Sequence, residues 1–230
     1  NILDDTVADF TIGLILALTR KICEGNSFVK AGKWKKNSWP LFLGEDLKDE
    51  LLGIIGMGNI GKKIALRAQS FGLKIIYHNR NKLKKNIERK YSANYSSLEN
   101  LLNKSKYVLL ALPLNAKTKH LINEKTLSMM RKDAYIVNIA RGKIIKECDL
   151  VMALENNIIA GAALDVFEYE PEVNKKLLTM KNTVLMPHAG SASFTTRNAM
   201  IDLALKNIND FFLLGKCNNL VNNNLFKNGK

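Results

Sequence analysis

The stretch of residues 56–61, Gly-Met-Gly-Asn-Ile-Gly, constrains the fold more than any other part of this chain. It follows an apolar run at 51–55 that predicts a buried parallel strand, and it precedes residues 62–71, whose apolar side chains recur on one helical face. Strand, Gly-x-Gly-x-x-Gly and helix together bind a dinucleotide, because the glycines allow the backbone to approach a pyrophosphate closely. The helix N-terminus adds N–H donors and the positive end of a dipole.

Apolar runs and helical patterns alternate along the rest of the chain. Strands are expected at 51–56, 73–78, 107–112, 134–138, 158–164 and 183–186, and helices at 62–71, 96–102, 146–155 and 195–214. Strands joined by helical crossovers form a parallel sheet with helices on both faces. The predicted fold is therefore α/β, a doubly wound parallel sheet of the Rossmann type. Residues 1–190 are expected to form the dinucleotide-binding domain, and residues 191–230 a C-terminal helix and tail.

The leading segment, residues 1–48, is assigned to the same domain. Asp4, Asp5 and Thr6 are expected to cap a helix that runs to Leu18. This helix carries apolar residues on more than one face: Val7, Phe10, Ile12, Leu14, Ile15, Leu16 and Leu18. One face can pack on the sheet, and the excess predicts a second partner. A basic loop with Trp34 follows at 32–44.

Bulk properties argue against several classes of partner. The net charge of +14 permits nucleic-acid binding, but Lys and Asn are abundant throughout the chain, so no nucleic-acid partner is expected. The longest apolar run, at 12–18, is far shorter than the ~20 residues of a membrane span, so no membrane partner is expected. The three cysteines have no metal-ligand or redox spacing, and no leader peptide is visible. We expect no metal and a cytoplasmic location. The chain begins without Met and is expected to be a fragment.

Ligands of such sheets bind beyond the carboxyl ends of the strands. Candidate residues follow the expected strands at the glycine loop, Asn79 with Arg80, Pro113, Arg141, Asp165 and His188. Because these strand ends meet at one edge of a parallel sheet, the residues predict a single site.

Three residues suggest a reaction. Arg141 can hold a carboxylate by two parallel hydrogen bonds, and His188 can pass a proton to a carbonyl oxygen. Glu170 beside His188 would fix its tautomer and stabilise its charged form. With hydride from a nicotinamide, these groups would reduce a 2-keto acid or oxidise a 2-hydroxy acid. Each has a structural alternative: an ion pair for Arg141, a turn cap before Pro171 for Glu170, and a buried structural role for His188.

The chain resembles the D-isomer-specific 2-hydroxyacid dehydrogenase family. The resemblance rests on residues 5–9, 53–61, 112–114, 138–142, 163–171 and 187–191 in that order, with 29 residues from Arg141 to Glu170 and 18 more to His188. Within the family, residues 3–6 and 71–80 are most similar to glyoxylate/hydroxypyruvate reductases. The implied reaction is reduction of a small 2-keto acid, glyoxylate or hydroxypyruvate, to the D-2-hydroxy acid.

The resemblance also implies roles for individual residues. Arg141 would bind the substrate carboxylate, His188 would be the acid/base, and Glu170 its partner. The expected cofactor contacts are Gly56, Gly58, Asn59, Ile60, Gly61, Asn79, Arg80, Pro113, Ile139, Ala140, Asp165, His188, Gly190 and Thr6. Relatives use the helix at 6–18 and the following loop in a two-fold dimer, which predicts a homodimer here.

The residue after the second strand bears on cofactor choice. An NAD site usually has Asp or Glu roughly 20 residues after the glycines, to hold the ribose hydroxyls. Asn79 stands there instead, followed by Arg80, and an arginine can clamp a 2′-phosphate. NADP is therefore expected to be preferred, with NAD possible.

Two departures from the family pattern affect function. Family members carry a further N-terminal segment that supplies most of a substrate-binding domain, so the C-terminal helix is expected to belong to a second, largely missing domain. The loop at 34–44 is shorter than in typical glyoxylate reductases, which leaves substrate choice open. The alternative to an enzyme is a dinucleotide-sensing binding module of the corepressor kind, or an inactive cofactor-binding fragment.

Overall fold

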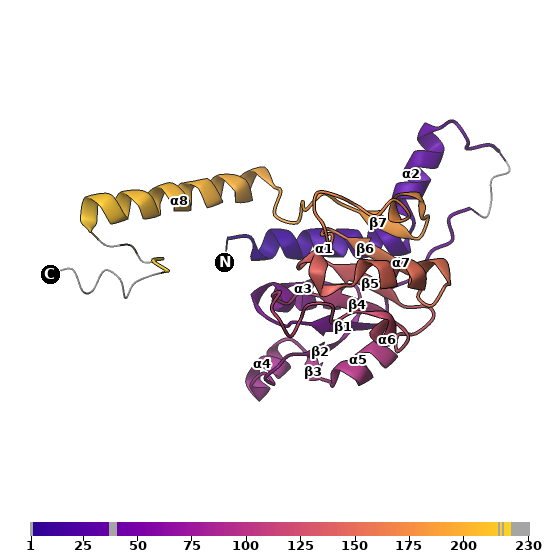
Figure 1. Cartoon of the computed structure of the whole chain (residues 1–230), viewed down its shortest axis with the longest axis horizontal. Coiled ribbons are helices and arrows are strands. Elements are labelled where there is room, and N and C mark those ends of the chain that lie inside the picture. Colours follow the sequence, from indigo (N-terminus) through magenta and orange to yellow (C-terminus); the bar gives the residue numbers. More distant parts are fainter. Residues whose placement is uncertain (1, 37–40, 216, 218, 222–230) are drawn as a thin grey trace. The chain divides into compact units, whose positions relative to one another are not determined.

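The computed structural model describes residues 2–36, 41–215, 217 and 219–221. The chain divides into two compact units, Leu3–Gly190 and Ser191–Lys230. The first unit holds a seven-stranded, entirely parallel sheet in the order β3-β2-β1-β4-β5-β6-β7 (Figure 1). This order, in which the chain reverses direction between β1 and β4, confirms the predicted doubly wound fold. The strands are Leu51–Ile55 (β1), Lys74–His78 (β2), Ala93–Tyr95 (β3), Tyr107–Leu110 (β4), Tyr135–Asn138 (β5), Gly161–Leu164 (β6) and Thr183–Leu185 (β7).

Helices connect the strands and cover both faces of the sheet. In the first unit they are Asp4–Thr19 (α1), Ile22–Lys30 (α2), Asn59–Ser70 (α3), Lys85–Lys90 (α4), Leu98–Lys104 (α5), Glu124–Leu127 (α6) and Glu147–Glu155 (α7), with 3₁₀ turns at Gly142–Ile144 (η1) and Leu177–Thr179 (η2). The second unit is built on Phe194–Leu214 (α8), which Ser193 caps by accepting the Thr196 N–H at 3.2 Å. None of the described helices is both long and apolar enough to cross a membrane.

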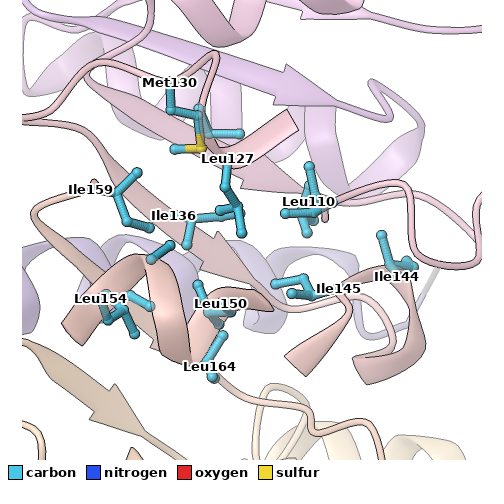
Figure 2. Packing of buried hydrophobic residues seen from close by; sticks show 14 of the residues in the cluster. Leu110, Leu127, Met130, Ile136, Ile144, Ile145, Leu150, Leu154, Ile159 and Leu164 are labelled. Carbon is cyan, nitrogen blue, oxygen red and sulfur yellow. The ribbon is translucent and has the colours of Figure 1, made fainter. Parts of the chain in front are cut away.

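Two separate apolar cores lie on the two faces of the sheet. Side chains of a strand alternate between faces, so Val108 and Leu110 of β4 enter one core while Tyr107 and Leu109 enter the other. The first core is closed by α5, α6 and α7, and Figure 2 shows its central aliphatic residues interlocking between strands and helices. The second is closed by α1 and α3. The sheet is thus covered on both faces, and its strand ends are left to hold a site.

The start of α1 differs from the prediction. Asp4 and Asp5 lie inside the first turn, and the N-cap is Leu3, which makes no side-chain capping hydrogen bond. The acidic residues instead favour the positive end of the helix dipole and bind cations on α3: Asp5 pairs with Lys63 at 3.0 Å and with Arg67 at 2.9 Å. The predicted cap is therefore wrong.

Most apolar side chains of α1 are covered within the first unit, so α1 itself offers little surface for a second partner. Val7, Ile12, Leu14, Ile15 and Leu18 are all buried within the chain itself, because α1 packs against α3 as well as β5, β6 and β7. Only Phe10 and Leu16 of the predicted set remain partly exposed. Within the first unit, exposed apolar side chains are found on and after α2, at Val29, Trp34, Leu41, Phe42 and Leu43. Residues 37–40 of the predicted loop lie outside the described residues.

Candidate active site

The glycine loop has the shape that a dinucleotide phosphate requires. Gly56 has a φ of 101°, and a Cβ there would lie 2.5 Å from the Ala111 carbonyl oxygen. Gly58, the N-cap of α3, gives the first turn no side-chain capping hydrogen bond, and a Cβ there would meet open space. A Cβ on Gly61 would lie 2.7 Å from the Gly56 carbonyl oxygen, so helix and loop approach closely. The uncapped helix end and the bare backbone fit a pyrophosphate. Because the turn ends at Gly58, α3 begins at Asn59, three residues before the predicted start.

The Asn79 side chain is hydrogen-bonded to this loop. Its Oδ1 accepts the Met57 N–H at 2.7 Å, which links the end of β2 to the glycine turn. The adjacent Arg80 is exposed. The following chain is held by Tyr77, whose hydroxyl accepts the Leu83 N–H at 2.8 Å and donates to Glu88 Oε1 at 2.9 Å. Burial raises the pKa of Tyr77 to about 12, so this hydroxyl remains a donor at neutral pH.

His188 and Glu170 form a pair beyond β6 and β7. His188 Nδ1 lies 3.0 Å from Glu170 Oε2. Glu170 Oε1 accepts the Phe167 N–H at 3.0 Å. Burial raises the pKa of the Glu170 carboxyl, but the hydrogen bonds from His188 and Phe167 lower it more, so the net pKa is below its usual value. The carboxylate is thus ionised at neutral pH, and the Nδ1 contact leaves Nε2 of the half-exposed His188 ring for a ligand.

Asp165 fixes the backbone that carries His188. Its buried carboxylate accepts the N–H groups of Ala189 at 2.7 Å and Gly190 at 2.9 Å, and its carbonyl oxygen accepts the His188 N–H at 2.9 Å. These bonds hold His188 in a left-handed conformation, with a φ of 53°. Burial raises the Asp165 pKa by more than the two N–H groups lower it. The carboxyl oxygens predicted to face a cofactor thus also bind the histidine loop.

Arg141 is exposed at the end of β5, with its Nη1 donating to the Ala140 carbonyl oxygen at 2.6 Å. Asn138, which the sequence analysis did not select, shapes this turn from a fully buried position. Its Oδ1 accepts the Ala140 N–H at 3.1 Å, and its Nδ2 donates to the Arg141 carbonyl oxygen at 3.2 Å. A polar residue ending an apolar strand was the signal that could have found it.

The other predicted cofactor residues lie around the same edge. Ile139 is half-buried between Asn138 and Ala140, and Pro113 is exposed after β4. Thr6 lies near the start of α1, whose Val7 would come within 3.8 Å of a Cβ on Gly190. The structure therefore brings all the predicted site residues to the carboxyl edge of the sheet or its border with α1.

A cavity of about 310 Å³ adjoins the His188–Glu170 pair. It is lined mainly by apolar side chains from the segments that follow β6 and flank β7: Phe167, Pro171, Val173, Leu178, Leu185, Met186 and Pro187. Arg141 does not line it, so this cavity is not the whole of a site that includes the arginine. It can accept an apolar group next to the histidine.

Known proteins are similar to this chain in sequence and in fold. Residues 12–190 match the family described as D-isomer specific 2-hydroxyacid dehydrogenase, NAD binding domain. The chain is 46% identical over 212 residues to a glyoxylate reductase of Pyrococcus horikoshii, an alignment that covers 90% of this chain and 63% of that protein. A glyoxylate reductase of Aeropyrum pernix is 43% identical over 231 residues, with 98% of this chain and 69% of the relative covered.

Solved structures of glyoxylate reductases are also similar to this chain. A glyoxylate reductase from Paecilomyes thermophila is similar with a TM-score of 0.87 at 38% identity, covering 97% of this chain and 66% of that one. An NADPH-dependent glyoxylate/hydroxypyruvate reductase from Sinorhizobium meliloti, in complex with NADP and malonate, gives a TM-score of 0.88 at 34% identity, covering 95% and 67%. The chain thus spans about two thirds of the length of these proteins, and 63% of the Pyrococcus relative.

Proposed function

Because this chain belongs to the D-isomer-specific 2-hydroxyacid dehydrogenase family, we propose that its protein reduces glyoxylate or hydroxypyruvate to the 2-hydroxy acid, of D configuration where the product is chiral. The observation that carries the proposal is the 3.0 Å contact between His188 Nδ1 and Glu170 Oε2 at the edge that also presents Arg141. The similarity to glyoxylate reductases supports the substrate class.

Each residue has a defined part in this reaction. A bound dihydronicotinamide would supply the hydride. Arg141 holds the carboxylate of the 2-keto acid by paired hydrogen bonds, which directs the carbonyl toward His188. His188 donates its Nε2 proton to the carbonyl oxygen as that oxygen becomes a hydroxyl. Glu170 accepts the Nδ1–H and stabilises the charged ring before the transfer.

NADP is proposed as the preferred cofactor. The 2′-phosphate would lie near Arg80, because Asn79 brings the end of β2 against the glycine loop. Asn79 carries no charge to repel a phosphate, and Arg80 can form charge-assisted hydrogen bonds to it. The neighbouring Lys82, whose Nζ lies 5.4 Å from the centroid of the Tyr95 ring, adds positive charge.

Arg80→Ala should lower the ratio of kcat/KM for NADPH to kcat/KM for NADH by about 10-fold or more, the effect of losing hydrogen bonds to a charged group. NADH, which lacks the phosphate, should be used almost as before. Lys84→Ala, which removes an exposed charge nearby, is the control. An unchanged ratio in Arg80→Ala would mean that this arginine is only solvated.

Arg141→Lys should raise the KM for glyoxylate strongly and lower kcat, while the Kd for NADPH barely changes. Lysine keeps the charge but cannot form the paired, planar hydrogen bonds of a guanidinium. Arg131→Lys, near the start of β5 and thus at the opposite edge of the sheet, is the matched control. Steady-state kinetics with varied glyoxylate decide the point, and unaltered kinetics in Arg141→Lys would reject the carboxylate role.

The rate of reduction should fall on the alkaline side, because His188 must be protonated to act as the donor. Glu170→Gln removes the negative charge that stabilises the imidazolium, so the alkaline limb of the kcat/KM profile should move to lower pH. The lowered Glu170 pKa means that this charge is present throughout the neutral range in the native protein. A Glu170→Gln profile that superimposes on the wild-type profile would show that the two side chains are not coupled.

We also propose a homodimer. The support is the exposed apolar surface on α2 and the chain after it, where Phe28 and Phe42 stack edge to face with centroids 5.2 Å apart. Such a contiguous apolar surface is typical of a protein–protein contact. The contribution of α1 is limited to its partly exposed Phe10 and Leu16.

A further inference from the structure

Glu168 is a buried carboxylate that no step of the proposed reaction uses. Its side chain is only 8% exposed, and its Oε1 lies 2.6 Å from His120 Nε2. Its Oε2 accepts the N–H of Glu147, the first residue of α7, at 2.9 Å, and its own N–H donates to Glu147 Oε2 at 3.1 Å. Burying a carboxylate is costly unless its oxygens are hydrogen-bonded, and here both of them are. The histidine is thus part of what allows the carboxylate to be buried.

The loop that supplies His120 is bound to the segment that follows Arg141. The His120 N–H donates to the Lys143 carbonyl oxygen at 2.9 Å, and the Ile122 N–H donates to the Ile144 carbonyl oxygen at 3.0 Å. The Lys146 N–H donates to the Ile122 carbonyl oxygen at 2.8 Å. His120 therefore links two segments: its backbone binds the segment that follows Arg141, and its side chain contacts Glu168.

The backbone at Phe167 and Glu168 contacts the segment next to Arg141 and also the Glu170 side chain. A Cβ on Gly142 would lie only 1.8 Å from the Phe167 carbonyl oxygen, so the chain next to Arg141 rests directly on this backbone. The Phe167 N–H binds Glu170 Oε1 at 3.0 Å. Any shift of residues 167–168 would change the spacing between Arg141 and the Glu170–His188 pair.

We propose that His120 and Glu168 form a positioning pair that sets this spacing. Neither side chain is assigned a contact with substrate or cofactor, and the pair acts through the backbone on either side of the site. The inference rests on the proposed function, since spacing matters for catalysis only if Arg141 and His188 hold the same substrate. A misplacement of about 1 Å can cost about 10²-fold in rate.

The test uses the protein as its gene encodes it, with glyoxylate and NADPH as probes. His120→Ala should lower kcat by about 10- to 100-fold and change the Kd for NADPH far less, because the glycine loop and Arg80, which are proposed to hold the phosphates, lie elsewhere. His120→Gln, whose amide N–H can reach Glu168, should recover most of the lost kcat. Lys176→Ala, which breaks the 2.9 Å ion pair with Glu155 at the far end of α7, is the control and should keep wild-type kcat. Wild-type kcat in His120→Ala, or a Gln variant as poor as the Ala variant, would overturn the proposal.

A second readout does not depend on activity. In His120→Ala, amide hydrogen exchange should accelerate in peptides that cover residues 141–146 and 165–170, and it should stay unchanged over β1 and α3. Unchanged exchange in both peptides would overturn the positioning pair. If wild-type protein binds NADPH but does not reduce glyoxylate, the proposed function fails, and the exchange measurement alone decides whether His120 and Glu168 hold these segments together.

Discussion

His188→Ala should lower kcat for glyoxylate reduction by about 10²–10⁴-fold, the usual contribution of general acid–base catalysis. The variant loses the side chain that the proposed reaction uses to donate a proton to the carbonyl oxygen. NADPH binding should be retained, since the glycine loop and Arg80 do not depend on the ring. The fold should also be retained, because the side chain is 53% exposed and the loop is held by Asp165 through backbone N–H groups.

Added imidazole provides the matched check on His188→Ala. A small imidazole can enter the space left by the ring and donate the missing proton, so part of the lost rate should return in proportion to its concentration. Glyoxylate kinetics of His188→Ala within a few fold of wild type, in a folded protein that binds NADPH, would rule out the acid/base role.

Gly142→Ala should be the most destabilising substitution in the neighbourhood of the site. The added methyl group would lie 1.8 Å from the Phe167 carbonyl oxygen and 2.5 Å from the Glu168 nitrogen, which are backbone atoms and cannot turn aside. Overpacking of this kind costs about 1–3 kcal/mol and occasionally more. We expect the upper end of that range, which corresponds to a Tm lower by about 6–12 °C for a chain of this size.

Gly13→Ala is the control for this substitution. Gly13 lies inside α1, and a Cβ there would meet nothing within 4 Å. Alanine should therefore stabilise the helix by about 0.5–1 kcal/mol. Thermal unfolding of the two variants separates a steric effect at residue 142 from a general effect of replacing glycine. Equal Tm values for Gly142→Ala and wild type would mean that the backbone contact with Phe167 is not close in solution.

Features encoded by short stretches of sequence were predictable. The glycine loop needs only neighbouring residues, because the turn at Gly56 and the helix that starts after Gly58 are adjacent in the chain. The parallel sheet followed from alternation of apolar runs and helical patterns, and its strand ends gather the predicted residues at one edge. The motif spacing grouped Arg141, Glu170 and His188, and the structure joins the last two by a 3.0 Å contact.

Features that depend on distant contacts were not predictable. His120 and Glu168 are separated by 48 positions, and nothing local to either residue shows that they meet. The residues around Gly142 in the sequence suggest an ordinary turn glycine. Its close approach to the Phe167 backbone exists only in the folded chain. The capping prediction for α1 failed for the same reason, since Asp5 is engaged by Lys63 and Arg67 of another helix. The short elements β3, α4 and α6 carry too few residues for a periodic pattern.

The burial of α1 shows that its apolar pattern alone does not identify the partner that covers it. Its apolar residues do fall on more than one face, but α3 and the sheet together cover most of them. The sequence pattern predicts how much of the helix surface is buried. It does not predict whether the residues that bury it belong to the same chain or to another. The exposed apolar residues on and after α2 are therefore the better basis for a dimer.

Loss of the reduced-nicotinamide absorbance with glyoxylate or hydroxypyruvate is the direct assay for the proposed reduction of a 2-keto acid. We expect the protein encoded by the gene to consume NADPH only when a 2-keto acid is present, with one hydroxy acid formed per NADPH, and we expect His188→Ala nearly to abolish the loss. Saturable binding of NADPH without any turnover of either acid would rule out the proposed reductase activity and would instead favour a dinucleotide-sensing binding module.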